Sequence, residues 1–152
     1  MTSQCLPISD MSAQPNTSHS TGSGKQSRLR ILHVDDNPMC REITRRTLRR
    51  EGHTITSAPD AVEGERLLTD HPEDFDLLIT DHEMPIRTGL EFVSRLAGNP
   101  FRGGILVFSG ALTPHLIDEY RHVGITHYLA KPTSVREIAE AVSAFQPHQI
   151  RA

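Results

Sequence analysis

Four apolar segments of this sequence are each followed closely by side chains that could do chemistry. Asp35 and Asp36 follow the segment at 29–34, Asp81 follows 75–80, Ser109 stands near the end of 104–110, and Lys131 follows 126–130. Charge at the end of a buried strand costs free energy unless a cation or a ligand compensates for it. If the fold brings the three carboxylates together, they repel one another and favour a bound cation.

A divalent cation would suit these acids. Mg²⁺ prefers oxygen ligands and is held by a few carboxylates and several waters. Ser109 and Lys131 would then be available for an anion beside the metal. Carboxylate, metal, hydroxyl and ammonium around one space can transfer a phosphoryl group onto an aspartate, and this is the chemistry that the residues predict.

The segments between these residues alternate between strand-like and helix-like patterns from residue 29 onward. Continuous or alternating apolar runs predict strands, and amphipathic spacing with cap residues predicts helices. The predicted strands are 29–34, 53–58, 75–80, 104–110 and 126–130. The predicted helices run from a cap at Asp36 or Asn37 to about Glu51, over 59–71 and 88–98, from a cap at Thr113 to Gly124, and over 133–145 with Thr133 or Ser134 as cap.

Five strands alternating with five helices predict a doubly wound α/β fold. The central strands are apolar throughout, as in a parallel sheet covered by helices on both faces. Right-handed crossovers place the carboxyl ends of all strands on one edge of the sheet, where such folds bind ligands. The acids, Ser109 and Lys131 are therefore expected on this edge.

The composition is that of a single soluble domain with a tail. The chain has 152 residues and only 36% hydrophobic content, and residues 1–27 are rich in small polar residues, which predicts disorder. No secretory signal or membrane-spanning run is apparent, so a cytoplasmic location is expected. Cys5 and Cys40 do not suggest a disulfide framework or a thiolate metal site, and the net charge of −3 argues against a nucleic-acid binder.

Four motifs in this order resemble the receiver domain of two-component response regulators. They are the acidic pair Asp35-Asp36, "TDHEMPIRTG" from Thr80, "FSG" from Phe108, and "YLAKP" from Tyr128. The resemblance covers residues 28–147, leaving 148–152 as a short C-terminal tail. It implies a flavodoxin-like (βα)5 fold with strand order 2-1-3-4-5.

The resemblance also implies a role for each matching residue. Asp81 is the expected phosphoacceptor, Lys131 and Ser109 contact the phosphoryl group, and Ser109 and Tyr128 form a switch. The expected Mg²⁺ ligands are Asp35, Asp36, Asp81 and the backbone carbonyl of Glu83, and the Lys131–Pro132 bond is cis in relatives. Glu83 and Ala111 occupy positions that tune dephosphorylation in relatives. For Tyr128, simple half-buried packing is the alternative interpretation.

Other side chains have plainer interpretations. Nine histidines are present, but none shows a metal-ligand spacing, and His33 is expected to be a neutral, hydrogen-bonded imidazole in a buried strand. The first predicted helix carries Arg41, Arg45, Arg46, Arg49 and Arg50. This run is interpreted as a solvated face, with a docking surface for a kinase as the alternative.

The predicted function is that of a stand-alone receiver in a phosphorelay. Asp81 accepts a phosphoryl group from a histidine kinase or histidine phosphotransfer protein in a Mg²⁺-dependent reaction, and the domain catalyses its own phosphorylation and dephosphorylation without being an enzyme for other substrates. Output is expected through a protein target, with a phosphorylation-dependent dimer as one form and no direct DNA or membrane binding. A phosphorylation-independent adaptor is the first alternative. A phosphatase of the haloacid dehalogenase kind is less favoured, because it would require Asp-x-Asp where the acids here are adjacent.

Overall fold

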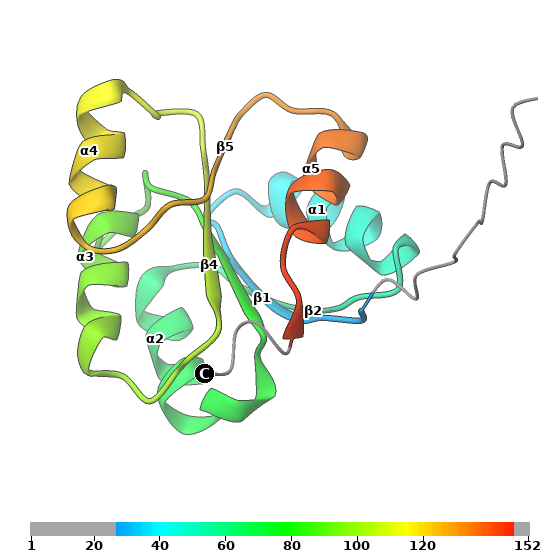
Figure 1. Ribbon diagram of the computed structural model, residues 1–152, viewed down its shortest axis with the longest axis horizontal. Coiled ribbons are helices and arrows are strands. Elements are labelled where there is room, and N and C mark those ends of the chain that lie inside the picture. Colours follow the sequence, from blue (N-terminus) through cyan, green and yellow to red (C-terminus); the bar gives the residue numbers. More distant parts are fainter. Residues whose placement is uncertain (1–26, 148–152) are drawn as a thin grey trace, which may run out of the picture.

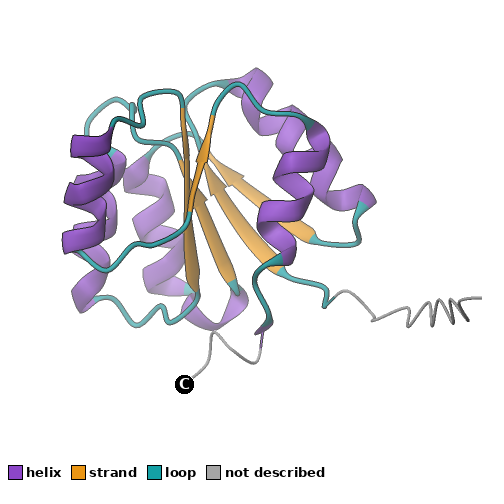
Figure 2. Cartoon of the chain, turned by 45° about the horizontal axis from the view of Figure 1, so that its top comes forward, coloured by secondary structure: helices purple, strands orange, loops and turns teal. Residues whose placement is uncertain are grey.

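The computed structural model describes residues 27–147, which form a parallel β-sheet between two layers of helices (Figures 1 and 2). The strands are Arg30–Val34 (β1), Thr54–Ala58 (β2), Leu77–Thr80 (β3), Gly104–Ser109 (β4) and Tyr128–Ala130 (β5). The helices are Pro38–Arg50 (α1), Ala61–Asp70 (α2), Gly89–Arg95 (α3), Pro114–His122 (α4) and Val135–Ser143 (α5), with 3-10 turns at Pro72–Asp74 (η1) and Leu96–Gly98 (η2). The predictions for 1–26 and 148–152 lie outside the described residues.

The sheet order is β2-β1-β3-β4-β5, with all neighbouring strands parallel, which confirms the predicted doubly wound fold. Helices α1 and α5 cover one face and α2, α3 and α4 the other (Figure 1). On the first face, Ile31 and Ile79 of the sheet pack in one apolar cluster with Leu48 of α1 and Val142 of α5. The sheet is thus buried on both sides, which explains why its central strands are apolar throughout.

Element ends differ from the predictions by one to three residues at most positions. The predicted helix 88–98 ends as an α-helix at Arg95, and η2 continues it as a tighter turn. The N-cap of α1 is Asn37, whose side chain accepts hydrogen bonds from the backbone N–H groups of Met39 and Cys40. Asp36 is therefore not used as a cap, and its exposed carboxylate remains at the edge of the sheet.

An ion pair at the amino end of the sheet holds β1 against β3. The Asp76 carboxylate accepts hydrogen bonds from the backbone N–H, Nε and Nη2 of Arg30, at 2.9–3.1 Å. Asp76 is 5% exposed, and a bidentate arginine contact at such a site fixes geometry as well as adding energy. The strands then pair in register from Ile31 with Leu77 to Val34 with Thr80.

Two further features of the structure bear on what the sequence predicted. The Lys131–Pro132 peptide bond is cis, as the family resemblance implies. Within residues 27–147, none of the helices combines the length and the apolar character that crossing a lipid bilayer requires.

The loop between β3 and α3 closes tightly on Gly89. The backbone N–H of Gly89 donates to the carbonyl of His82 at 2.8 Å. A Cβ at position 89 would lie 2.2 Å from the carbonyl oxygen of Asp81 and 2.5 Å from the Tyr120 hydroxyl. Glycine is therefore required here by close backbone approach.

Replacing Gly89 by alanine should destabilise the protein because backbone and a buried tyrosine would have to move. We expect Gly89→Ala to lower the free energy of unfolding by about 1–3 kcal/mol, measured by chemical denaturation. Gly98→Ala is the matched control, since a Cβ there meets no atom within 4 Å. The control should be neutral or stabilising by up to about 1 kcal/mol. Equal effects of the two substitutions would contradict the steric explanation.

Candidate functional site

The candidate site lies at the carboxyl edge of the sheet, where the β1–β3 register fixes two aspartates. Val34 pairs with Thr80, so the next residues along the two strands, Asp35 and Asp81, lie side by side. Both are buried, with Asp35 fully inaccessible and Asp81 7% exposed. The backbone N–H of His82 donates to Oδ1 of Asp81 at 2.7 Å and orients that carboxylate.

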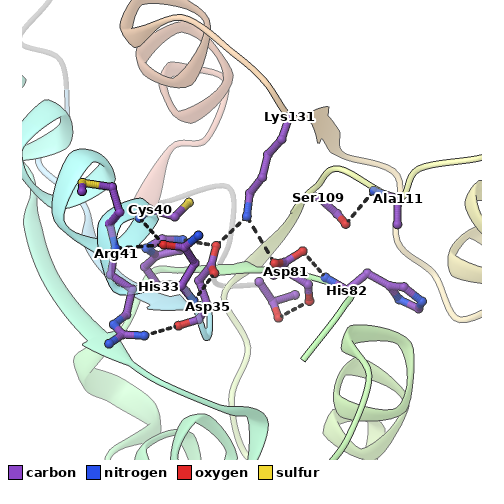
Figure 3. Close-up of polar contacts among 12 residues, drawn as sticks. His33, Asp35, Cys40, Arg41, Asp81, His82, Ser109, Ala111 and Lys131 are labelled. Carbon is purple, nitrogen blue, oxygen red and sulfur yellow. Dashed lines mark hydrogen bonds and ion pairs between the residues drawn. The ribbon is translucent and has the colours of Figure 1, made fainter. Parts of the chain in front are cut away.

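Lys131 joins the two aspartates (Figure 3). It follows β5, and its Nζ donates to Oδ2 of Asp35 at 2.6 Å and to Oδ2 of Asp81 at 3.2 Å. The same ammonium lies 5.0 Å from the centre of the Phe108 ring, within range of a cation–π contact. One cation thus offsets part of the repulsion between two buried carboxylates.

Asp36 adds a third carboxylate to this cluster. Asp35, Asp36 and Asp81 each offer an oxygen, and these atoms all lie within 4.8 Å of one another. Two of the acids are buried and one is exposed, so the cluster is open to solvent on the Asp36 side. An all-carboxylate donor set that is open to water suits a hard divalent cation, and the cluster could hold one.

Ser109 and Tyr128 lie on the neighbouring strands but not in this hydrogen-bonded group. Ser109 is buried at the end of β4, and its Oγ accepts a hydrogen bond from the backbone N–H of Ala111 at 3.2 Å. Tyr128 is half-buried, and its hydroxyl donates to the backbone carbonyl of Ile125. The structure therefore brings together Asp35, Asp36, Asp81 and Lys131, and places Ser109 and Tyr128 beside them.

Local environment shifts the ionisation of Asp35 and Lys131. Burial alone would raise the pKa of Asp35, but hydrogen bonds from Lys131 and from the backbone of Asn37 outweigh it, and that pKa is lowered. Burial opposes the charge of Lys131 as well, yet its two aspartate partners raise the pKa of the ammonium. Both groups are therefore charged at neutral pH.

His33 departs from its predicted environment. It is fully buried and, as predicted, neutral, because burial lowers the pKa of its imidazole to about 4. The predicted hydrogen bond is wrong: among residues 27–147, neither ring nitrogen has a hydrogen-bond partner. The Asp35 carboxylate lies 3.8 Å from Nε2, too far for a hydrogen bond.

The structure also shows a polar pair that the sequence did not suggest. Nδ1 of His82 and the hydroxyl of Tyr120 share a hydrogen bond of 2.8 Å. Tyr120 is fully buried in α4, and its ring packs 6.4 Å from that of Tyr128. The signal was available, since Leu116 and Tyr120 fall on one helical face, and a buried tyrosine normally needs a partner for its hydroxyl.

Comparisons with known proteins all indicate the same family. Residues 31–143 match the response regulator receiver domain. The probable C4-dicarboxylate response regulator DctR of Priestia megaterium is 25% identical over 80% of this chain and 53% of its own length. The peroxide stress-activated histidine kinase mak3 of Schizosaccharomyces pombe is 29% identical over 68% of this chain but only 5% of its own length. The chain thus spans about half or less of these two relatives.

Solved structures agree with this comparison. The chemotaxis protein CheY4 of Vibrio cholerae is 27% identical and superposes with a TM-score of 0.71, covering 79% of this chain and all of that one. A response regulator receiver protein from Pseudomonas putida is 28% identical with a TM-score of 0.70, covering 78% of this chain and 98% of that one. Both likenesses cover more than three quarters of this chain.

Removing one of the three clustered charges should stabilise the metal-free protein. We expect Asp36→Asn to raise the free energy of unfolding by on the order of 1 kcal/mol in a chelating buffer, because like charges this close repel. Added Mg²⁺ should stabilise the wild type more than the variant, since a ligand that binds only the folded state raises its stability. Urea denaturation with and without Mg²⁺ measures both effects. Asp118→Asn, on the exposed face of α4, is the control and should show neither the gain in metal-free stability nor the weaker response to Mg²⁺. An identical Mg²⁺ effect in the wild type and both variants would contradict the cluster as a cation site.

Burial of His33 should make stability depend on pH. The unfolded imidazole takes up a proton near pH 6.5, whereas the folded one resists protonation down to about 4. Stability from this group is therefore complete above pH 6.5 and is lost as the pH falls towards 4, by up to about 3 kcal/mol. We expect His33→Leu to be at least as stable as wild type at pH 7 and to lose less stability at pH 4.5, in denaturation measured at both pH values. The exposed His122→Asn is the control, and parallel pH curves for wild type and His33→Leu would refute this assignment.

Proposed function

The chain belongs to the response regulator receiver domain family, and we propose that Asp81 accepts a phosphoryl group from a phosphohistidine donor in a Mg²⁺-dependent reaction. The observation that carries this proposal is the Lys131 ammonium, which bridges Asp35 and Asp81 at 2.6 and 3.2 Å. An ammonium aimed at a buried carboxylate beside an acidic cluster provides positive charge where a phosphoryl group would arrive.

The residues of the acidic cluster fit a magnesium ion. Asp35, Asp36 and Asp81 would supply carboxylate oxygens, and the backbone carbonyl of Glu83 would complete the protein ligands. When bound, the ion would neutralise the charge of the cluster and of the phosphoryl oxygens. Without such neutralisation, an anionic phosphoryl group would approach three carboxylates against their repulsion.

The chain's own groups orient the reacting atoms. The N–H of His82 occupies Oδ1 of Asp81, and Lys131 contacts Oδ2, so Oδ2 is the oxygen that we assign as nucleophile. The bond from phosphorus to the donor imidazole nitrogen breaks as the bond to this oxygen forms, and the nitrogen keeps the electron pair. Lys131 then moves with the charge from the carboxylate to the phosphoryl oxygens.

Ser109 and Tyr128 would transmit the modification. The Ser109 hydroxyl can exchange its contact with the Ala111 N–H for one with a phosphoryl oxygen. That movement would vacate space into which the half-buried Tyr128 ring turns, leaving the Ile125 carbonyl that it now contacts. Phosphorylation would thereby bias a two-state equilibrium of the surface formed by α4, β5 and α5 towards binding a protein target. Water would release the phosphate, at a rate tuned by Glu83 and Ala111.

Partners follow from the same assignment. Family members interact with histidine kinases or phosphotransfer proteins, and we assign this chain the same class of donor. The arginines of α1 are in part neutralised by their own helix, since Glu42 pairs with Arg45 and Arg46 at 2.6 Å each. The exposed Met39 and Ile43 on this helix add apolar surface, which favours the docking interpretation over a merely solvated face.

Incorporation of phosphate from acetyl phosphate, with and without Mg²⁺, tests the proposal directly. Intact-protein mass spectrometry should show a single phosphoryl group on the wild type only when Mg²⁺ is present, and none on Asp81→Asn. Asp118→Asn is the matched control and should be labelled like the wild type. Labelling that survives Asp81→Asn would move the phosphoacceptor elsewhere. A folded wild type that neither takes up phosphate nor binds Mg²⁺ would instead favour the phosphorylation-independent adaptor.

A further inference from the structure

One buried polar side chain in this structure is not explained by the proposed phosphoryl transfer. His33 lies on the α1 side of β1, is fully inaccessible, and has no hydrogen-bond partner for either ring nitrogen among the described residues. A buried polar group without a partner is unfavourable, because it has given up its hydrogen bonds to water and gained none in the protein. Its persistence within an otherwise apolar strand suggests a ligand that the protein chain itself does not supply.

Two other potential metal ligands lie next to the His33 ring. Asp35 is two residues further along the chain, and its Oδ2 is 3.8 Å from Nε2 of His33. Cys40 belongs to the first turn of α1, which the Asn37 cap holds above the end of β1. One donor atom from each of His33, Asp35 and Cys40 lies within 4.8 Å of the other two. Figure 3 shows His33 and Cys40 together on the side of Asp35 that faces away from Asp81.

We propose that His33, Asp35 and Cys40 form a second cation site, selective for a borderline-soft divalent transition metal such as Zn²⁺. Imidazole, carboxylate and thiolate are the three side-chain ligands that zinc takes in proteins. Mg²⁺ is excluded by the same set, because it prefers oxygen ligands and rarely accepts sulfur. The site is thus chemically distinct from the all-carboxylate cluster on the other side of Asp35.

The geometry requires only small side-chain movements. Zinc bonds of about 2.0–2.3 Å in a tetrahedral arrangement bring donor atoms to about 3.5 Å from one another. The observed separations, at most 4.8 Å, therefore need to shrink by about 1 Å, which rotation of the half-buried Cys40 side chain can provide. A ring nitrogen of His33 would donate its lone pair to the ion. The Cys40 thiol would bind as a thiolate and release its proton to solvent, and water would complete the coordination. No bond within the protein chain is broken.

Occupancy of this site should oppose phosphorylation, because Asp35 belongs to both sites. Its Oδ2 already accepts the hydrogen bond from Lys131 at 2.6 Å, and its carboxylate is one of the three in the acidic cluster. An ion held by His33 and Cys40 would draw Asp35 and its charge away from both. This inhibitory consequence rests on the proposed function, whereas the metal site itself does not.

Binding is tested with Co²⁺, which reports tetrahedral geometry and thiolate ligation in its absorption spectrum. Titration of the full chain with cobalt chloride, in the Cys5→Ser variant and in the exposed control His122→Asn, should give a one-to-one complex with a thiolate charge-transfer band. Stoichiometric zinc sulfate should abolish that band. Cys40→Ser should lose it entirely, and His33→Leu should weaken binding by more than about a hundredfold, since even an outer-shell partner is worth about 10–100-fold.

Two outcomes would overturn the site. One is a cobalt spectrum without a thiolate band in the Cys5→Ser protein. The other is a band that survives in Cys40→Ser, which would assign the ion elsewhere. Urea denaturation of the Cys40→Ser protein and its binding of Mg²⁺ would establish that this variant is folded, so that a lost band reports the missing thiolate.

Inhibition is tested separately by the initial rate of phosphate incorporation from acetyl phosphate in excess Mg²⁺. Saturating zinc sulfate should slow the wild type at least tenfold, about 1.4 kcal/mol in the barrier, and leave Cys40→Ser unaffected. Inhibition that persists in Cys40→Ser would place zinc in the acidic cluster and overturn the competition. A wild type that shows the cobalt spectrum but takes up no phosphate without zinc would refute the proposed function and leave the metal site standing.

Discussion

The site depends first on the register between the two central strands. Val34 pairs with Thr80, so the residues that follow are neighbours at one height on the sheet edge. A slip of one residue would turn Asp81 to the other face and separate the carboxylates. At the opposite end, Arg30 holds the carboxylate of Asp76 through three hydrogen bonds. This contact, buried only on the Asp76 side, lies at the opposite end of the strands from the candidate site, yet it helps to fix the alignment that the site requires.

That alignment brings several negative charges together, and the fold neutralises them only in part. Two buried carboxylates and a third exposed one share a space less than 5 Å across, as the 4.8 Å limit on their oxygens shows. Lys131 supplies one positive charge, drawn in from the end of β5. The remaining negative charge is what a bound cation would neutralise, and functional sites commonly hold such unfavourable interactions. The proposed affinity for metal and the stability expected to be lost without it are therefore two aspects of the same arrangement.

The sequence predicted the fold and the acidic cluster because both follow from local patterns. Continuous apolar runs define buried strands, parallel strands share a carboxyl edge, and Asp81 and Lys131 are the residues that follow two of them. The interactions of Tyr120 and Cys40 did not follow from such patterns, because they depend on how α4 and α1 lie across the sheet. His33 was predicted to be neutral, but whether a buried imidazole has a partner is decided by its rotamer and by the neighbouring helix, and the sequence specifies neither.

Asp35 belongs to both proposed cation sites. One of its oxygens, Oδ1, accepts the N–H of Asn37 and so shapes the start of α1, while Oδ2 faces both Lys131 and His33. Two cations that need the same carboxylate must weaken each other, and linkage requires the two effects to be equal in free energy. If zinc lowers the affinity for magnesium by some factor, then magnesium lowers the affinity for zinc by that same factor. Under the two proposals, the response of phosphorylation to zinc would be set by the ratio of the two free-ion concentrations, and the proposed modification of Asp81 need not alter the protein fold for this competition to operate.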